Sequence, residues 1–198
     1  MLSLQKRSIA MLLLFFGATS VAFAHSDAAG MAGGFISGFS HPLGGLDHIV
    51  AMVAVGLWGA FLGRPAIWLL PIVFPLVMTL GGVLGVAGIP VPQVETGIAL
   101  SGLVLGLMVL LAVRPPLWVA AVLVGAFAIF HGHAHGTELP EAASPLAYSA
   151  GFVIATGLLH LGGILLGELS RWSWGAMAVR AGGAVIALVG VGFLTGMM

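Results

Sequence analysis

Residues 116–135 read PLWVAAVLVGAFAIFHGHAH, and this stretch decides the fold. It contains no Asp, Glu, Lys or Arg, and its apolar part continues without interruption up to Phe130. A helix of about 20 apolar residues matches the roughly 30 Å hydrocarbon core of a bilayer. The stretch therefore predicts a membrane-spanning helix that carries three histidines at one end.

Similar apolar runs fill most of the remaining chain. The chain has 198 residues, of which 60% are hydrophobic and 6% charged, too few charges for the surface of a soluble domain. Prolines stop the runs, because proline cannot continue a hydrogen-bonded helix. We predict an all-α polytopic membrane bundle, a single domain over residues 25–198. Its six spans are expected at 42–63, 66–88, 95–113, 116–135, 145–168 and 175–197.

The first 24 residues are typical of a cleavable signal peptide. Lys6 and Arg7 precede the apolar residues 9–16, and Ala22-Phe23-Ala24 supplies small residues for cleavage. We expect cleavage after Ala24, which leaves His25 as the first residue, where its α-amine and imidazole together form a potential chelating pair for a metal ion. An uncleaved first helix is the alternative. Either form places residue 25 outside the cytoplasm.

Charge asymmetry gives the orientation of the bundle. The arginines of the mature chain fall after spans one, three and five, whereas the loops after spans two and four carry acids and no basic residue. Basic loops stay in the cytoplasm. We therefore predict a bacterial inner-membrane protein with both mature termini in the periplasm. The arginines are Arg64, Arg114, Arg171 and Arg180, and the acids are Glu95, Glu138 and Glu141.

Composition excludes several function classes. The chain has no cysteine, so thiolate metal sites, disulfides and cysteine nucleophiles are absent. A net charge of zero gives no sign of nucleic-acid binding, and no GxxxxGK[ST] motif is present for nucleotide hydrolysis. We expect no prosthetic group. Small residues four apart suit tight helix contacts. These pairs are Gly81/Gly85, Gly102/Gly106, Gly163/Gly167 and Gly192/Gly196. The sequence does not decide between a monomer and a homo-oligomer.

Ionisable residues gather at two places in the predicted spans. An ionisable group at the centre of a span costs roughly 2.5–3.5 kcal/mol or more and is a functional candidate by default. Span one begins with His41, Asp47 and His48, and span four ends with His131, His135 and Glu138. Because span one begins at the side where span four ends, both groups lie at a similar depth. We expect them to share one site.

Helical spacing divides the second group. His131 and His135 are four residues apart and lie on one face of a helix, and Glu138 follows on the same stripe. His133 points elsewhere on a regular helix, unless the neighbouring glycines 132 and 136 loosen the turn. His160 stands alone in span five and is either a structural residue or a deeper metal station.

In the first group, His41 and His48 are seven positions apart, about 10 Å along a helix, too far for one ion. Pro42 suits a first helical turn and Gly44-Gly45 make the segment pliable, so His41 is expected just outside the helix, folding back towards Asp47. Asp47 is either a metal ligand or the partner that orients a neighbouring histidine ring.

Imidazole and carboxylate groups without thiolate suit Ni²⁺, Co²⁺, Zn²⁺ or Cu²⁺. The residues do not choose among these ions. The expected partners are thus a divalent metal ion and the lipid bilayer, with no nucleic acid.

The two motifs resemble those of the HupE/UreJ family of membrane metal permeases. They read His41-PLGGL-Asp47-His48 and Phe130-His131-Gly132-His133-Ala134-His135-Gly136-Thr137-Glu138. The resemblance spans essentially the whole chain. It implies secondary uptake of nickel, or of cobalt, for hydrogenase or urease maturation. It also implies that the functional residues are His41, Asp47, His48, His131, His135 and Glu138; it assigns no role to His133.

Three other functions remain open from the residues. An intramembrane zinc hydrolase could use the same histidines and Asp47. A serine protease could pair Ser101 with His160. A histidine pair could also bind haem.

Overall fold

The computed structural model describes residues 31–138 and 144–198. The predicted signal peptide, His25 and Glu141 lie outside the described residues. Within these ranges the chain forms helices and turns, with no strand, as predicted. The helices are α2 (Met31–Gly44), α3 (Leu46–Leu62), α4 (Ala66–Val86), α5 (Val94–Leu110), α6 (Leu117–Thr137), α7 (Pro145–Gly167) and α8 (Ser173–Leu194), and a 3-10 turn, η1 (Glu168–Arg171), follows α7.

Four of these helices are long and apolar enough to cross a membrane: α4, α6, α7 with its 3-10 turn, and α8. The bent pair α2 and α3 counts as a fifth span, and α5 is apolar but only 17 residues long. The chain is thus a membrane protein of packed helices. Six spans remain a prediction, although α4 to α8 begin and end within about three residues of the predicted limits.

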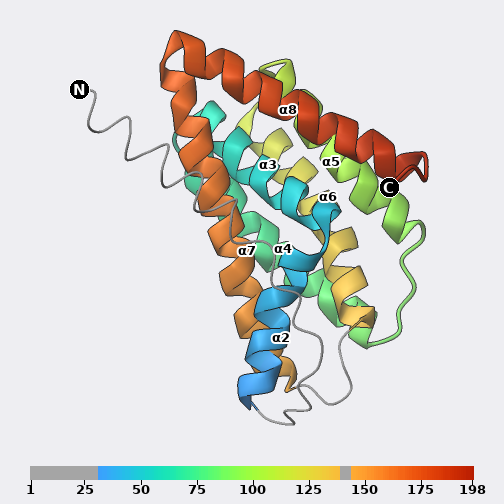
Figure 1. Cartoon of the computed structure of the whole chain (residues 1–198). Helices are drawn as coiled ribbons and strands as arrows, with labels where there is room; N and C mark the ends of the chain where they lie inside the picture. The colour runs from blue at the N-terminus through green and yellow to red at the C-terminus, as the bar shows by residue number, and fades with distance from the viewer. Residues whose placement is uncertain (1–30, 139–143) are drawn as a thin grey trace.

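The start of the first span differs from the prediction. His41 and Pro42 lie inside α2, a helix that the hydrophobic pattern missed, rather than outside and at the start of α3. The helix is interrupted at Gly45, where the chain turns by 83° into α3. Figure 1 shows α2 lying beside α7, and the glycines explain this contact. A Cβ at Gly38 would overlap the Tyr148 carbonyl, and one at Gly151 would overlap that of Phe35.

Glycines also set the contact between α4 and α6. A Cβ on Gly81 would overlap the Ile129 carbonyl, and one on Gly132 would overlap the Met78 carbonyl. The two helices therefore touch backbone to backbone, which dispersion alone can stabilise in a bilayer. Gly136 packs on Gly82 in the same way, so α6 continues as a helix to Thr137 and the glycines do not loosen its last turn.

Two other predicted glycine pairs also mark helix contacts. Gly106 lies against Ala187 of α8, and Gly163 lies against the Val53 carbonyl of α3. The pair Gly192/Gly196 does not, because Gly192 faces Met198 of its own helix end and Gly196 has nothing near it.

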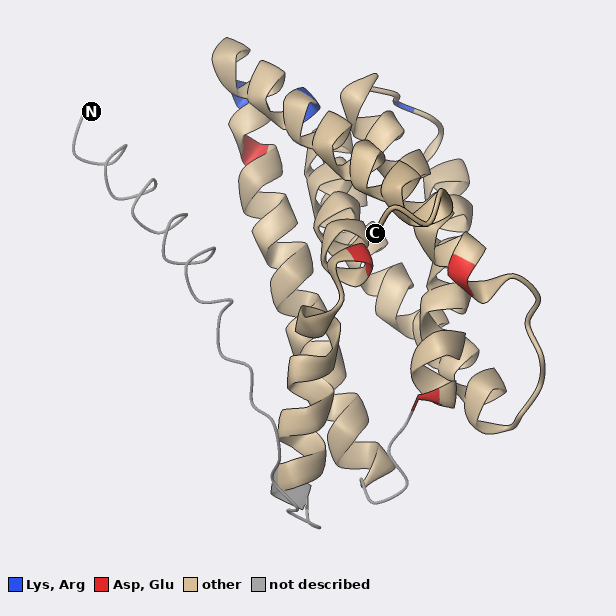
Figure 2. Ribbon diagram, turned by 45° about the vertical axis from the view of Figure 1, so that its right-hand side comes forward, with Lys and Arg blue, Asp and Glu red and all other residues tan. Residues whose placement is uncertain are grey.

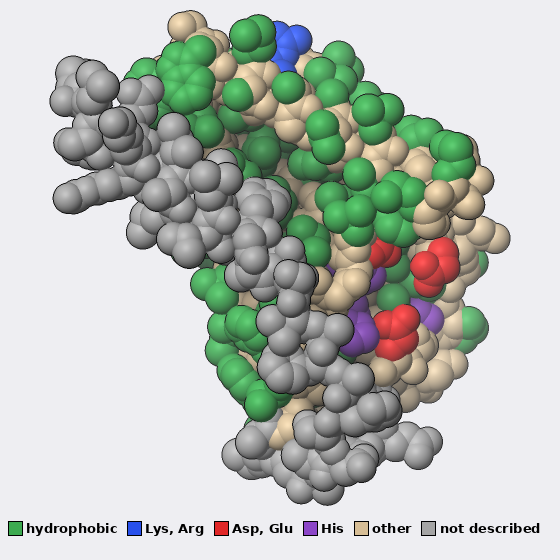
Figure 3. All heavy atoms as spheres, viewed as in Figure 1, with side chains coloured by type: hydrophobic (Ala, Val, Ile, Leu, Met, Phe, Trp, Pro, Cys, Tyr) green, Lys and Arg blue, Asp and Glu red, His purple; other side chains and the backbone are tan. Residues whose placement is uncertain are grey.

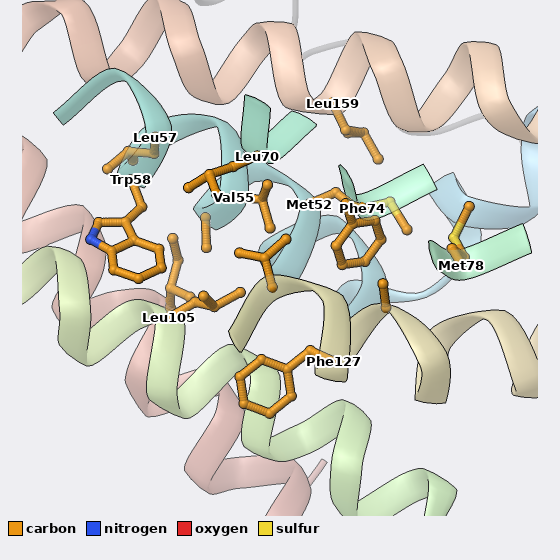
Figure 4. Packing of buried hydrophobic residues seen from close by; sticks show 14 of the residues in the cluster. Met52, Val55, Leu57, Trp58, Leu70, Phe74, Met78, Leu105, Phe127 and Leu159 are labelled. Carbon is orange, nitrogen blue, oxygen red and sulfur yellow. The ribbon is translucent and has the colours of Figure 1, made fainter. Parts of the chain in front are cut away.

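Large apolar side chains fill the centre of the bundle. Trp58 of α3, Phe74 of α4 and Leu105 of α5 are fully buried in one cluster, which Figure 4 shows from close by. The Trp58 indole N–H donates to the Val113 carbonyl at 3.1 Å, so its polar atom is also satisfied. This core fixes the helices that carry the histidines.

The arginines lie at one end of the bundle, where Figure 2 shows every blue segment. Arg171 pairs with Glu168 at 2.5 Å, and Arg114 lies over the Phe61 ring at 4.4 Å. One prediction was wrong: Arg180 lies within α8 rather than in a loop, and its Nε donates to the Leu110 carbonyl at 2.7 Å. Arg180 satisfies a carbonyl at the end of α5 and remains at the arginine end.

Candidate metal site

Three residues from two distant segments form a group with metal-ligand spacing. His41 comes from α2, His135 from the last turn of α6, and Glu138 from the residue that ends α6. One ligand atom from each lies within 4.8 Å of the others. The His41 Nε2–H donates to Glu138 Oε2 at 3.1 Å. Since bonds of about 2.1 Å allow two ligands of one ion to stand up to about 4.2 Å apart, a small side-chain movement would close this group around an ion.

This group of three residues is exposed on one side. The side chain of His41 is 31% exposed and that of Glu138 54%, whereas His135 is buried. Figure 3 shows purple histidine and red acidic side chains together on one face, away from the blue residues. Beyond the 83° bend at Gly45, His41 lies against His135 and Glu138 at the end of α6, whereas the prediction had it folding back towards Asp47.

A second set lies deeper. Asp47 Oδ1 accepts two hydrogen bonds from His48, one from the backbone N–H and one from ring Nδ1, each at 2.9 Å. The His48 ring lies 4.9 Å from the fully buried ring of His131, measured between centroids. Asp47 therefore orients His48 in this structure, which matches the second of the two roles considered for it.

His135 joins the two sets. Its ring centroid is 4.9 Å from that of His41 and 4.4 Å from that of His48. Neither of its ring nitrogens has a hydrogen-bond partner among the described residues. Buried polar atoms without a partner are costly, so they suit a site that binds something else. The six residues singled out by sequence thus come together as an outer trio and an inner trio: His41, His135 and Glu138, and Asp47, His48 and His131.

Two further histidines lie outside this cluster. His133 donates from Nε2 to the Ile89 carbonyl at 2.9 Å and so fastens the turn between α4 and α5 to α6. His160 is buried 5.4 Å from the Phe74 ring, and the same ring lies 5.5 Å from His131. Phe74 thus contacts both His131 and His160.

Sequence reasoning missed the partner of His131. Ser101 of α5 is fully buried and its Oγ lies 2.9 Å from His131 Nε2. The pairing of Ser101 with His160, considered from sequence, does not occur in the structure. The sequence does show the Ser101 hydroxyl in the middle of an apolar helix, but spacing alone could not predict which histidine it contacts.

A groove of about 410 Å³ runs between α4, α6 and α7 and reaches His135. Its walls are mostly apolar, with Met78, Val83 and Phe152 among them. The Phe152 ring lies 4.3 Å from that of His135 and forms one side of the outer trio. His135 is therefore approached from two directions, the solvent-facing side of His41 and this groove.

The chain is similar to proteins of one known family. No solved structure matches the chain. Protein HupE of Rhizobium leguminosarum bv. viciae is 47% identical over 173 residues, which cover 87% of this chain and 91% of that protein. The family described as HupE / UreJ protein matches residues 12–193. This span includes both histidine motifs and every described helix except the last residue of α8. The chain belongs to the HupE/UreJ family.

Proposed function

We propose that this protein imports a divalent transition metal, nickel first and cobalt second, through the histidine and carboxylate cluster. The imported ion would serve hydrogenase or urease maturation, as the family resemblance implies. The protein would act as a permease, not as an enzyme. The single observation that carries the proposal is the outer trio, with ligand atoms of His41, His135 and Glu138 within 4.8 Å of one another.

The donor types support a borderline metal. Imidazole suits Ni²⁺, Co²⁺ and Zn²⁺, and a carboxylate neutralises part of the ion's charge at the entrance. An ion would displace the proton that His41 Nε2 now shares with Glu138. His41 and Glu138 are thus the residues that would meet a hydrated ion first.

The gradient of burial supports inward movement. His41 and Glu138 are partly exposed, His135 is nearly buried, and His131 is fully buried. Because His135 is adjacent to both trios, an ion held by His41 and Glu138 could exchange them for His48 while keeping His135. Conduction needs several sites that bind and release, rather than one closed cage.

The test is uptake by proteoliposomes of the full chain, with radioactive nickel, cobalt and zinc compared side by side. We expect nickel and cobalt to accumulate. We expect His135→Ala to lower nickel affinity by at least about 100-fold, because it removes a ligand of the outer trio that also lies beside His48 of the inner trio. His133→Gln is the matched control, since its amide can still donate to the Ile89 carbonyl outside the cluster.

Two results would overturn the proposal. One is His135→Ala vesicles that accumulate nickel at the wild-type rate. The other is stoichiometric, tightly held zinc with hydrolysis of a lipid amide and no uptake, which would instead establish the zinc hydrolase.

A further inference from the structure

Ser101 makes two short contacts with its single hydroxyl group. Its Oγ lies 2.6 Å from the Ile98 carbonyl oxygen in its own helix and 2.9 Å from His131 Nε2 in α6. The side chain is completely buried, so no water competes for these contacts.

Counting protons assigns the direction of both bonds. A carbonyl oxygen can only accept, and a serine hydroxyl has one proton to donate and lone pairs to accept with. The Ser101 hydroxyl therefore donates its hydrogen bond to the Ile98 carbonyl, and Ser101 Oγ accepts a hydrogen bond from His131 Nε2–H. His131 then carries its hydrogen on Nε2, and its Nδ1 is a bare lone pair.

The bare nitrogen is buried and available. His131 Nδ1 has no hydrogen-bond partner among the described residues. The neighbouring ring has the opposite tautomer: the Asp47 carboxylate only accepts, so His48 carries its hydrogen on Nδ1 and presents a bare Nε2. His48 Nε2 is likewise buried and without a partner in the described part of the chain.

We propose that Ser101 is a positioning residue of the inner trio, which holds His131 as the Nε2–H tautomer so that Nδ1 is the metal-ligating atom. This proposal rests on the proposed function. Ser101 has the same role for His131 as Asp47 has for His48. Each accepts a hydrogen bond from one ring nitrogen of its histidine and leaves the second ring nitrogen available. Outer partners of this kind fix ring orientation and raise ligand basicity.

The same geometry argues against Ser101 as a nucleophile. A catalytic serine donates its hydrogen bond, and then its proton, to the histidine, whereas this hydroxyl donates its hydrogen bond to the Ile98 carbonyl.

The first experiment measures the tautomer directly. Full-length protein with ¹⁵N-labelled histidine is studied metal-free in micelles, with His131→Gln to assign the His131 signals. Two-bond nitrogen–proton spectra are expected to show the His131 hydrogen on Nε2 in the wild type. A His131 hydrogen on Nδ1 would overturn the proposal.

The second experiment measures nickel affinity by titration of the same protein. Ser101→Ala is expected to weaken binding by about 10–100-fold, and Ser101→Thr, which keeps the hydroxyl, to restore most of it. Thr156→Val is the matched control, because Thr156 is also fully buried but has no described hydrogen-bond partner. Unchanged affinity in Ser101→Ala, or an equal loss in Thr156→Val, would overturn the proposal.

The two proposals fail in different ways. Wild-type protein that binds no nickel, cobalt or zinc would refute the proposed function, while the tautomer spectra would still decide the Ser101 bond. If Ser101→Thr does not fold, the wild-type spectra together with Ser101→Ala decide the question.

Discussion

Asp47 accepts hydrogen bonds from both the backbone and the ring of His48. Its Oδ1 accepts from the His48 N–H and from His48 Nδ1, at 2.9 Å each. It also lies in the first turn of α3, where the exposed N–H groups of the helix favour a negative charge. These contacts explain why an acid precedes the histidine, and they leave His48 Nε2 free for an ion.

Substitutions at Asp47 separate the role of ligand from that of orienting partner. Asp47→Asn keeps an oxygen that can accept from His48, whereas Asp47→Leu removes it. If Asp47 orients the ring, nickel titration should show Asn close to wild type and Leu weaker by about 10–100-fold. An equal, severe loss in both variants would show instead that the carboxylate binds the ion.

Single residues also show where sequence reasoning succeeds and where it ends. The spacing of His131 and His135 places them on one helix face, and both do face the cluster. His133 was excluded from that face by the same rule, but its partner, Ile89, lies in a turn whose path no spacing predicts. Contacts of Ser101 likewise depend on how α5 packs against α6, which is a property of the assembled bundle.

At the scale of helices, the five from α4 to α8 followed from apolar length and proline breaks, while α2 did not. The segment of α2 is rich in glycine and polar residues, so hydropathy alone passes over it. Its missed signal was the pair Gly34/Gly38, because both glycines face α7. The break at Gly45 is equally hidden, since two consecutive glycines predict pliability but not an 83° bend.

The break between α2 and α3 gives a prediction with a close internal control. A Cβ at Gly45 would stand 2.7 Å from Asp47 Oδ1 and 3.1 Å from His48 Nδ1, whereas one at Gly44 would meet nothing within 4 Å. Gly45→Ala should therefore displace the Asp47–His48 pair and weaken nickel binding by about 10–100-fold. Gly44→Ala should leave affinity unchanged.

The measurement is nickel titration of both variants, with helix content checked by circular dichroism. Equal affinities for Gly45→Ala and wild type would mean that the pair does not depend on the room left by this glycine.

At the scale of the whole molecule, the arginines and the exposed tryptophans distinguish one end of the bundle from the other. The four exposed tryptophans lie within about four residues of an arginine, at the starts of helices: Trp68 in α4, Trp118 in α6, and Trp172 and Trp174 at α8. Tryptophan gathers at membrane interfaces, and arginine loops remain in the cytoplasm. The histidine and carboxylate cluster lies towards the opposite end, where α6 finishes.

The absence of cysteine makes this orientation directly testable, because a single introduced thiol reports on one position. Thr96 is exposed in the first turn of α5, near the histidine end, and Ser173 is exposed at the start of α8, at the arginine end. A membrane-impermeant maleimide should label Thr96→Cys in cells with a permeable outer membrane. Ser173→Cys should react only after the inner membrane is opened. The reverse pattern would place the histidine cluster on the cytoplasmic side, where it could release an ion but not capture one from outside, and import through this cluster would then be untenable.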